Sequence, residues 1–305
     1  MDIIKTIIPA AGIGSPFLPI TKAIPQEMLP LINKPAIDYI VQETLSSHVE
    51  QIIMILGRNK QTIADYFDNY SQLDTILDEE QQKNKLSGLA KIIRSAQFSY
   101  IHQSQPLGLG QAILAARSLI MPKEYFGILL PDDIIVSKTP ALEQLIRIAR
   151  QEKASVIAVQ EVPAECIPLY GIIDIKKQIT PNLFQVNRLI EKPSQTEAPS
   201  NLAVVGRYVL SQKIFDGLNS AQNYTEGDLH LTDGITHMIS QNEKVFAYKI
   251  SGIRYDIGTP LGWIKAVIGM GLNNPHYSPY LKKFLTNWDT LDSFLYNQEK
   301  NITHL

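Results

Sequence analysis

A glycine turn near the start of the chain is the first feature that could do chemistry. The apolar residues 7–11 lead directly into Gly12-Ile13-Gly14. Because glycine has no side chain, such a turn after a strand lets backbone N–H groups approach a phosphate, although a plain tight turn has the same pattern. Lys22 is the only cation between residues 10 and 30. The stretch therefore predicts a phosphate site with little positive charge of its own.

The turn matches neither of the two common phosphate motifs. The P-loop pattern G-x-x-x-x-G-K-[ST] is absent from the chain, and the dinucleotide pattern G-x-G-x-x-G fails at Phe17. Prolines at four later positions instead prevent a normal crossover helix and force a long, stiff loop, namely Pro19, Pro25, Pro30 and Pro35. Open α/β sheets bind ligands at such a loop, where the first strand ends.

Apolar runs and helical patterns alternate along the chain and must position this turn. Runs rich in β-branched residues predict strands at 3–8, 51–57, 126–133, 155–161 and 202–210. Helical spacing predicts helices at 34–45, 108–120 and 140–151. This alternation favours an α/β fold, a Rossmann-like, doubly wound, mainly parallel sheet with helices on both faces. After residue 155 the strands follow one another more closely, which predicts antiparallel additions in the C-terminal half.

Composition excludes several classes of protein. The chain has 305 residues and a net charge of −2, so no basic field attracts nucleic acid or a membrane surface. No apolar run is long enough to span a bilayer, and the start of the chain is interrupted too early by Lys5 and Pro9 for a signal peptide. Its single cysteine, Cys166, fits a reducing compartment. We therefore expect a cytoplasmic protein.

Two segments lie outside this strand–helix alternation. Residues 71–97 are polar and helical in pattern, which predicts an exposed insertion. The tail from about residue 273 breaks at two prolines and then resumes helical spacing, with apolar residues on one face at Phe284, Trp288, Leu291 and Phe294. That face packs either on the body of the protein or at a subunit interface.

Several stretches resemble the bacterial UTP–glucose-1-phosphate uridylyltransferases, within the sugar-phosphate nucleotidylyltransferases. The likeness begins with "IIPAAGIGSPFLPITKAIPQEMLPLINKPAIDYIV" at 7–41. It continues in order through "LGLGQAILAA" (107–116), "LLPDDIIV" (129–136), "YGIID" (170–174), "IEKP" (190–193), "APSNLAVVGRYVL" (198–210), "LTDGI" (231–235) and "YDIGTPLGW" (255–263). The resemblance covers nearly the whole chain. It implies one nucleotidyltransferase domain over 1–272, with a nucleotide half (about 1–150), a sugar-phosphate half (about 151–272), and a helical tail over 273–305.

The resemblance also implies a reaction and its reactants. A phosphate oxygen of glucose 1-phosphate attacks the α-phosphorus of UTP in line, giving UDP-glucose and pyrophosphate without a covalent intermediate. Mg²⁺ is the implied cofactor, with Asp132 and Asp256 as its ligands, since Mg²⁺ takes one or two carboxylates beside phosphates and water. Taken singly, a strand-end aspartate such as Asp132 is more often a cap or turn residue. The implied assembly is a homo-oligomer.

The remaining implied roles fall on three groups of residues. The nucleotide is assigned to Ala11, Gly12, Gly14, Glu27, Gln103 and Gly108, with Gln103 reading the uracil edge. The sugar is assigned to Gly171, Glu191, Val205, Gly206 and Asp228, where Asp228 stands in place of the family's usual glutamate. Lys22 and Lys192 are the implied catalytic cations, with Lys192 facing the attacking phosphate. Without the resemblance, Glu191 and Lys192 would be an ordinary solvated charge pair.

The chain departs from the family where the triphosphate binds. The family's G-x-G-T-R loop ends in an arginine, and this chain has Pro16 there. Gln26 replaces the lysine of the family's P-K-E-M string, and Leu107 replaces a third lysine. Pro16 lacks both the guanidinium and the backbone N–H. We therefore expect reduced activity.

Two hypotheses follow from these departures. The first is a working uridylyltransferase that makes UDP-glucose. The second is an impaired paralogue that binds UDP-glucose or a nucleotide, or regulates an active partner. Because the losses cluster on the triphosphate side, binding of UDP-glucose should be better preserved than turnover of UTP.

Overall fold

The protein is built around one mixed sheet that takes strands from both halves of the chain. The structure is a computed structural model that describes residues 2–68, 81–105, 107–224 and 227–287. Within these residues the main sheet has nine strands in the order β5-β4-β1-β6-β11-β8-β12-β10-β9. Seven strands run in one direction, while β10 and β11 run against them. The predicted α/β class, with a mainly parallel sheet and antiparallel additions, is confirmed.

The elements have the following bounds. The main-sheet strands are β1 (Lys5–Ala10), β4 (Gln51–Leu56), β5 (Gln97–His102), β6 (Tyr125–Leu129), β8 (Ser155–Glu161), β9 (Gly171–Thr180), β10 (Leu183–Glu191), β11 (Leu202–Ser211) and β12 (Val245–Lys249). Two small sheets pair β2 (Pro30–Leu31) with β3 (Lys34–Pro35), and β7 (Asp133–Val136) with β13 (Ile253–Asp256). The α-helices are α1 (Ala36–Ser46), α2 (Gln61–Tyr66), α4 (Gln81–Ser95), α5 (Leu109–Ala115), α6 (Ala141–Glu152), α7 (Ile214–Gln222), α8 (Leu231–Ser240), α9 (Pro260–Asn273) and α10 (Ser278–Thr286).

The predicted strands and helices are found with small shifts. The first strand starts at Lys5 and continues to Ala10. It therefore includes Pro9, although proline has no N–H to donate and is rare inside strands. The run predicted as one strand at 126–133 divides into β6 and β7, because a turn at Pro131-Asp132 interrupts it. The helix predicted at 108–120 is shorter: α5 ends at Ala115, and a 3₁₀ turn at Arg117–Leu119 follows.

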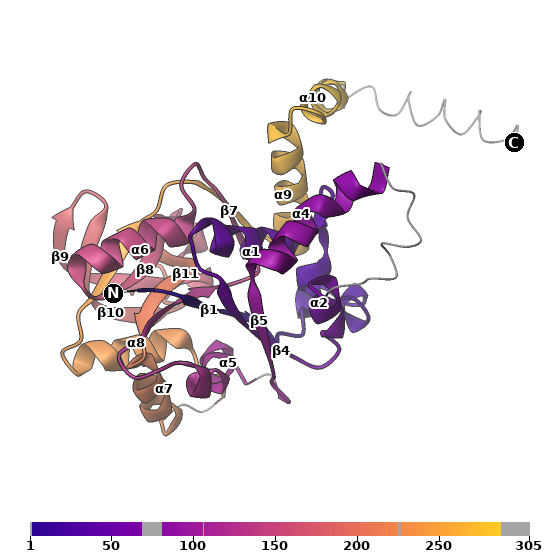
Figure 1. The fold of residues 1–305 in the computed structure, drawn as a ribbon. Helices are drawn as coiled ribbons and strands as arrows, with labels where there is room; N and C mark the ends of the chain where they lie inside the picture. The colour runs from indigo at the N-terminus through magenta and orange to yellow at the C-terminus, as the bar shows by residue number, and fades with distance from the viewer. Residues whose placement is uncertain (1, 69–80, 106, 225–226, 288–305) are drawn as a thin grey trace, which may run out of the picture.

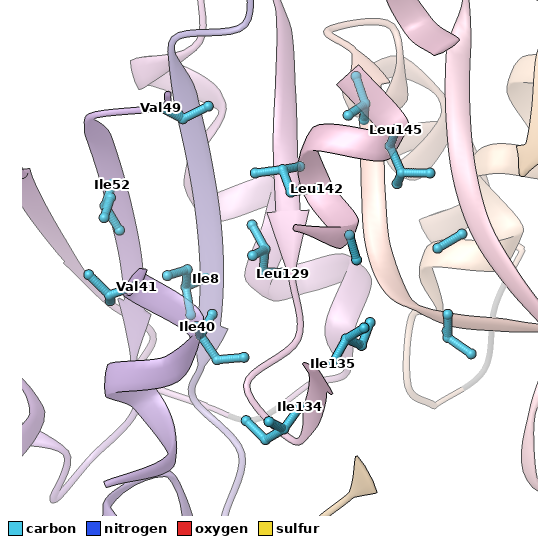
Figure 2. Close-up of a cluster of buried hydrophobic side chains, with 14 of the residues drawn as sticks. Ile8, Ile40, Val41, Val49, Ile52, Leu129, Ile134, Ile135, Leu142 and Leu145 are labelled. Atoms are coloured by element: carbon cyan, nitrogen blue, oxygen red, sulfur yellow. The ribbon is translucent and has the colours of Figure 1, made fainter. Parts of the chain in front are cut away.

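Helices cover both faces of the sheet, as Figure 1 shows. Side chains alternate between the two faces along each strand. On β4, Ile52 and Met54 pack on one face against α1 and α6, while Ile53 and Ile55 pack on the other face, which α5, α7 and α8 cover. Figure 2 shows part of the first core, with Ile40 and Val41 of α1 beside Ile8 of β1, and Leu142 of α6 next to Leu129 of β6. These buried aliphatic layers hold the strand ends rigid.

The proline-rich loop after β1 is held in a compact form. Three 3₁₀ turns follow one another at Ser15–Phe17, Ile20–Lys22 and Gln26–Met28, and the β2–β3 hairpin completes the loop. Only then does α1 begin, with Pro35 as its N-cap residue. The stiff loop that the prolines predict is therefore present.

The prediction of an exposed insertion at 71–97 fits the solvent-facing side of α4 but misses its packed face. Ile92 of α4 is buried, and Leu89 packs against the same core as α1. Their spacing on one helical face explains this packing. Residues 69–80 lie outside the described part. Of the predicted tail face, Phe284 lies on α10 and is half-exposed, whereas Trp288, Leu291 and Phe294 lie beyond the described residues. In the described part of the chain, every helix is too short or too polar to cross a membrane.

Candidate active site

A pocket opens where the parallel strands of the first half end. Its volume is about 350 Å³. Ala11 and Gly12 follow β1, Gln103 follows β5, and Pro131 and Asp132 follow β6. The carboxyl ends of these strands meet at one edge of the sheet, which is where α/β folds bind ligands. The fold therefore places the glycine turn at a genuine cavity.

Eight of the sequence-predicted site residues line this pocket. They are Ala11, Gly12, Gly14, Glu27, Gln103, Gly108, Asp132 and Asp228. The other seven do not line it: Lys22, Gly171, Glu191, Lys192, Val205, Gly206 and Asp256. The predicted nucleotide residues therefore come together as one set, and the predicted sugar residues lie mostly apart from it.

The glycine turn has the backbone that its sequence requires. Gly14 has a φ of +69°, and the Thr21 hydroxyl donates a hydrogen bond to its carbonyl oxygen over 2.8 Å. A Cβ atom at Gly14 would lie 2.9 Å from the Thr21 side chain, so a larger residue does not fit. A Cβ atom at Gly12 would meet nothing within 4 Å. Gly12 thus leaves its backbone open toward the pocket.

Gly108 and Asp228 lie next to each other at the far side of the pocket. Gly108 has a φ of +92°, and a Cβ atom there would lie 2.7 Å from the Leu229 carbonyl oxygen and 3.1 Å from the Asp228 Cβ atom. Asp228 is therefore placed beside a predicted nucleotide residue, although the resemblance implied a sugar contact for it.

This crowding gives a test by substitution. We expect Gly108→Ala to lower the free energy of unfolding by about 2 kcal/mol or more, because the positive φ and the close carbonyl oxygen both oppose a side chain. The matched control is Gly88→Ala on the exposed part of α4, where a Cβ atom meets nothing within 4 Å. That change should raise stability by about 0.5–1 kcal/mol. Urea unfolding of both variants measures this, and equal effects would contradict it.

Gln103 presents an unpaired donor to the pocket. Its side-chain Nε2 atom is buried and has no hydrogen-bond partner. A buried amide donor without a partner is costly, so it is expected to be satisfied by something that enters the pocket. An amide side chain can both donate to and accept from the edge of a base. The geometry therefore fits a base-reading residue.

The two predicted metal carboxylates converge although they are far apart in sequence. Strands β7 and β13 pair antiparallel with Asp256 opposite Asp133, which brings Asp256 to the turn that carries Asp132. A Cβ atom at Gly258 would lie 3.1 Å from Asp256 Oδ1 and 3.6 Å from Asp132 Oδ2. Both carboxylates therefore reach the same small region at the edge of the pocket.

The electrostatics of this region favour a cation. Burial raises the pKa of Asp132 to about 7, and the negative charges of Asp133 and Asp256 add to this rise. A backbone hydrogen bond and the positive charge of Arg254 oppose it. Within the described residues, no group of three or more His, Cys, Asp and Glu side chains is arranged as a metal cage. Two carboxylates with open positions suit Mg²⁺, which keeps waters and substrate phosphates in its shell.

Arg254 joins the carboxylates into a network. Its Nε atom donates to Asp133 Oδ1 over 2.5 Å, and its Nη2 atom donates to Asp256 Oδ2 over 3.2 Å. The Tyr170 hydroxyl also donates to Asp256 Oδ2 over 2.9 Å, and the guanidinium lies 4.8 Å from the centre of the Tyr170 ring. These contacts fix the Asp256 carboxylate in one orientation.

The predicted sugar residues gather on β9, β10 and β11. Glu191 Oε2 accepts a hydrogen bond from the Thr232 hydroxyl over 3.0 Å, and a Cβ atom at Gly171 would lie 3.2 Å from the same oxygen. Gly206 donates from its N–H to Asp133 Oδ2 over 2.8 Å. Val205 is fully buried with its side chain in the core, so only its backbone is available to a ligand. Lys192 is exposed and has a φ of +45°.

Positive charge is scarce at the pocket. Among the described lining residues three carry carboxylates, Glu27, Asp132 and Asp228, and none is a lysine or arginine. Lys60 lies nearby, but its Nζ atom donates to Glu27 Oε2 over 2.5 Å and both side chains are buried. Burial raises the pKa of Glu27, and the Lys60 ammonium opposes this rise. Lys22 is exposed and outside the lining.

Three basic residues around the site were missed in the sequence: Lys60, Arg207 and Arg254. Each pairs with an acid far along the chain, and these pairs do not show in the sequence. Arg254 also pairs with Asp256 two residues later, a close charge pair that the sequence does show. Arg207 offered a usable signal, because it is a lone charge inside the apolar run "LAVVGRYVL". A charged residue in a buried strand needs a partner.

The chain is similar to proteins of known type along most of its length. A family profile described as "Nucleotidyl transferase" matches residues 5–268. A UTP–glucose-1-phosphate uridylyltransferase of Staphylococcus epidermidis is 42% identical over 285 residues, 93% of this chain and 98% of the relative. The enzyme of the same name in Staphylococcus haemolyticus is 43% identical over 282 residues, 92% of this chain and 96% of the relative.

Solved structures are similar in both fold and sequence. A UDP-glucose pyrophosphorylase complexed with UDP-glucose has a TM-score of 0.81 and 35% identity, and the match covers 90% of this chain and 100% of that one. A UTP-bound UGPase from Acinetobacter baumannii has a TM-score of 0.82 and 36% identity, with coverage of 93% and 99%.

Proposed function

Because the chain belongs to the nucleotidyl transferase family, we propose that it is a uridylyltransferase that makes UDP-glucose and pyrophosphate from UTP and glucose 1-phosphate. The phosphate oxygen of glucose 1-phosphate forms a bond to the α-phosphorus of UTP, and the bond from that phosphorus to the pyrophosphate oxygen breaks. The relatives at 42–43% identity carry this activity in their names. The sequence resemblance pointed to the same reaction.

The pocket is the observation that carries the proposal. It combines open backbone at Gly12, an unpaired amide donor at Gln103 and the backbone of Gly108 in the lining of one cavity at the strand ends. This set is suited to a base and its attached phosphates. We assign the base to Gln103 and Gly108, with Ala11, Gly12, Gly14 and Glu27 around the nucleoside.

The other two predicted groups extend the site toward β11. We assign glucose to Gly171, Glu191, the backbone of Val205 and Gly206, and place Asp228 between the base and the sugar. Lys192 is the proposed cation for the attacking phosphate. Lys22 is the proposed cation for the triphosphate, and it must move its exposed side chain toward the pocket to act there.

We further propose that Asp132 and Asp256 hold Mg²⁺. The two carboxylates approach one point beside Gly258, and they leave positions free for phosphate oxygens and water. When bound, the ion supplies neutralisation of the phosphate charge that develops during transfer. Arg254 and Tyr170 keep Asp256 oriented for this contact.

The proposed enzyme binds the triphosphate of UTP more weakly than its relatives do. Among the described residues that line the pocket there is no basic side chain, and Pro16 and Gln26 stand where the family has arginine and lysine. The wholly non-catalytic paralogue, which sequence analysis left open, finds no support in the comparisons, whose named relatives are enzymes. Reduced turnover remains our proposal.

A pyrophosphate-release assay with UTP, glucose 1-phosphate and Mg²⁺ tests the activity directly. Release that requires all three components is the expected result. Parallel reactions with other nucleoside triphosphates and with mannose 1-phosphate define the specificity. Release that is independent of glucose 1-phosphate, or none at any enzyme concentration, would refute the assignment.

The uracil-reading role of Gln103 gives a prediction about binding. We expect Gln103→Leu to raise the KM for UTP about tenfold, since one hydrogen bond to a buried partner is worth about 1.4 kcal/mol. The KM for glucose 1-phosphate should change less than about twofold, because nothing places Gln103 on the sugar side. Gln105→Leu, an exposed glutamine two residues later, is the matched control. Equal KM values for both variants would remove Gln103 from the site.

We also propose one nucleotidyltransferase domain over 1–272, a C-terminal tail over 273–305, and a homo-oligomer. The sheet takes strands from both halves, which supports a single domain. Exposed apolar side chains along α9 and α10, among them Leu261, Ile264, Tyr280 and Phe284, support contact with a second copy. Figure 1 shows these helices extending from the body. The cytoplasm remains the proposed location, with phosphorylated small molecules as partners.

A further inference from the structure

Arg207 is a fully buried arginine on β11 whose five N–H donors all have acceptors. Its Nε and Nη2 atoms donate to the two oxygens of Glu43, over 2.9 and 2.8 Å. Nη1 donates to the carbonyl oxygens of Leu130 and Gly206, over 3.1 and 2.9 Å, and Nη2 donates also to that of Asp133, over 2.7 Å. A guanidinium has five such donors in a fixed plane. Every hydrogen-bond donor of the Arg207 side chain is therefore satisfied.

The three carbonyl groups belong to the backbone of the site. Leu130 and Asp133 lie on either side of the turn that carries Asp132. The Leu130 N–H donates to the Gly206 carbonyl oxygen over 2.9 Å, and the Gly206 N–H donates to Asp133 Oδ2 over 2.8 Å. The guanidinium thus ties the Asp132 turn on β6–β7 to Gly206 on β11.

Glu43 anchors the other side of the guanidinium. It lies on α1, and its Oε1 atom also accepts a hydrogen bond from the Leu142 N–H at the start of α6, over 3.0 Å. Its side chain is 8% exposed, so solvent screens the pair only weakly. Helices α1 and α6, which pack in the core of Figure 2, therefore fix the position of Glu43 and, through it, that of Arg207.

We propose that Arg207 is a positioning residue for the transfer reaction. It fixes the distance between the Asp132 carboxylate, on the metal and nucleotide side, and the Gly206 backbone, on the sugar side. The inference rests on the proposed function, because only there do these two groups act on reactants that must meet in line. Misplacement of reacting groups by about 1 Å costs about 10²-fold in rate.

Arg207→Lys tests this proposal, because lysine keeps the charge but has three donors on a flexible stem. We expect kcat to fall about 30-fold, while the KM for UTP changes less than about threefold, since Gln103 and Gly108 make no bond to Arg207. Binding of Mn²⁺ with UDP-glucose present, followed by electron paramagnetic resonance, should weaken about tenfold. This second readout needs no turnover.

Leu145→Ala controls for stability alone. Leu145 is fully buried on α6, and its aliphatic side chain forms no hydrogen bond with Arg207 or Glu43. It should lower the melting temperature but leave kcat and Mn²⁺ binding within about twofold of the wild type. If Arg207→Lys behaves in the same way, Arg207 is only structural and the proposal is overturned.

Glu43→Gln provides a second route if Arg207→Lys does not fold. The amide keeps one acceptor for Arg207 and removes the charge, so we expect the same pattern with a smaller loss, about fivefold in kcat. Unchanged kcat and Mn²⁺ binding in this variant also overturn the proposal. A wild type that binds Mn²⁺ but does not turn over UTP with glucose 1-phosphate refutes the proposed function instead, and the Mn²⁺ comparison still decides the role of Arg207.

Discussion

Replacing Asp132 with asparagine lowers kcat about 10³-fold at saturating substrates. The substitution keeps the size of the side chain and removes one of the two carboxylates that converge beside Gly258. Metal neutralisation of phosphoryl charge is worth several kcal/mol, and about 4 kcal/mol corresponds to this rate factor. Because the pocket lining within the described residues lacks lysine and arginine, no side chain there replaces the lost neutralisation.

Two measurements make this result specific. Mn²⁺ binding to the nucleotide complex should weaken in Asp132→Asn while its melting temperature stays near that of the wild type, which separates loss of the ion from loss of the fold. Asp216→Asn is the matched control, since Asp216 lies in an exposed surface pair with Arg117; we expect its kcat to stay within about twofold of the wild type. A kcat for Asp132→Asn within tenfold of the wild type would show that Asp132 does not carry the ion.

Restoring the family's cations at positions 16 and 26 raises the rate about 10²-fold in the double variant Pro16→Arg/Gln26→Lys. An arginine acting on phosphoryl transfer is worth about 10³–10⁵, and imperfect placement reduces the gain. Pro16 is exposed in the 3₁₀ turn Ser15–Phe17, so the larger side chain has room. Gln26 lies beside Gly14, where a lysine can reach the same phosphates.

The two single variants, Pro16→Arg and Gln26→Lys, should gain different amounts of catalytic rate. Gln26→Lys loses the hydrogen bond from Gln26 Nε2 to the Ile257 carbonyl oxygen, which now helps to hold the loop after Asp256. Its gain is therefore smaller than that of Pro16→Arg. Pro16→Gln is the matched control, because it restores the backbone N–H without a charge. If it equals Pro16→Arg, the missing N–H accounts for the deficit and the missing guanidinium does not.

Calorimetry distinguishes the phosphates involved. The double variant should bind UTP about tenfold more tightly, whereas its affinity for UDP-glucose should change less than about threefold, because UDP-glucose lacks the terminal phosphates. A wild type with ordinary turnover, together with reversions that gain nothing, would falsify our account of the phosphate loop.

The elements were predictable where local pattern decides structure. The run "QIIMIL" became β4 because β-branched residues fit a strand that is buried on both faces. The prolines fixed the loop after β1 for an equally local reason. The division between β6 and β7 had a local signal in Pro131, but the apolar run continues after it at Ile134, and the run was predicted as one strand.

The glycine positions of the site could be predicted from the sequence, whereas its ion pairs could not. Glycines signal close approach wherever they occur, so the pocket at Gly12 and Gly14 could be expected. Ion pairs such as Glu43–Arg207 and Asp133–Arg254 join residues 164 and 121 positions apart, and only the folded sheet brings them together. The position of Asp228 beside Gly108 depends in the same way on packing between distant segments.

On the proposed assignment of Asp132 and Asp256 as metal ligands, the pairing of β7 with β13 sets the point in synthesis at which the site is complete. A ribosome that has delivered the first half of the chain has already made the glycine turn, Gln103 and Asp132, but the second carboxylate arrives only with residue 256. Chains that end before β13 therefore lack Asp256 of the proposed metal pair and Ile257 of the pocket lining. On the proposed assignment of Asp132 and Asp256, we expect transfer to require the docking of β13, so a chain that ends before this strand should be inactive.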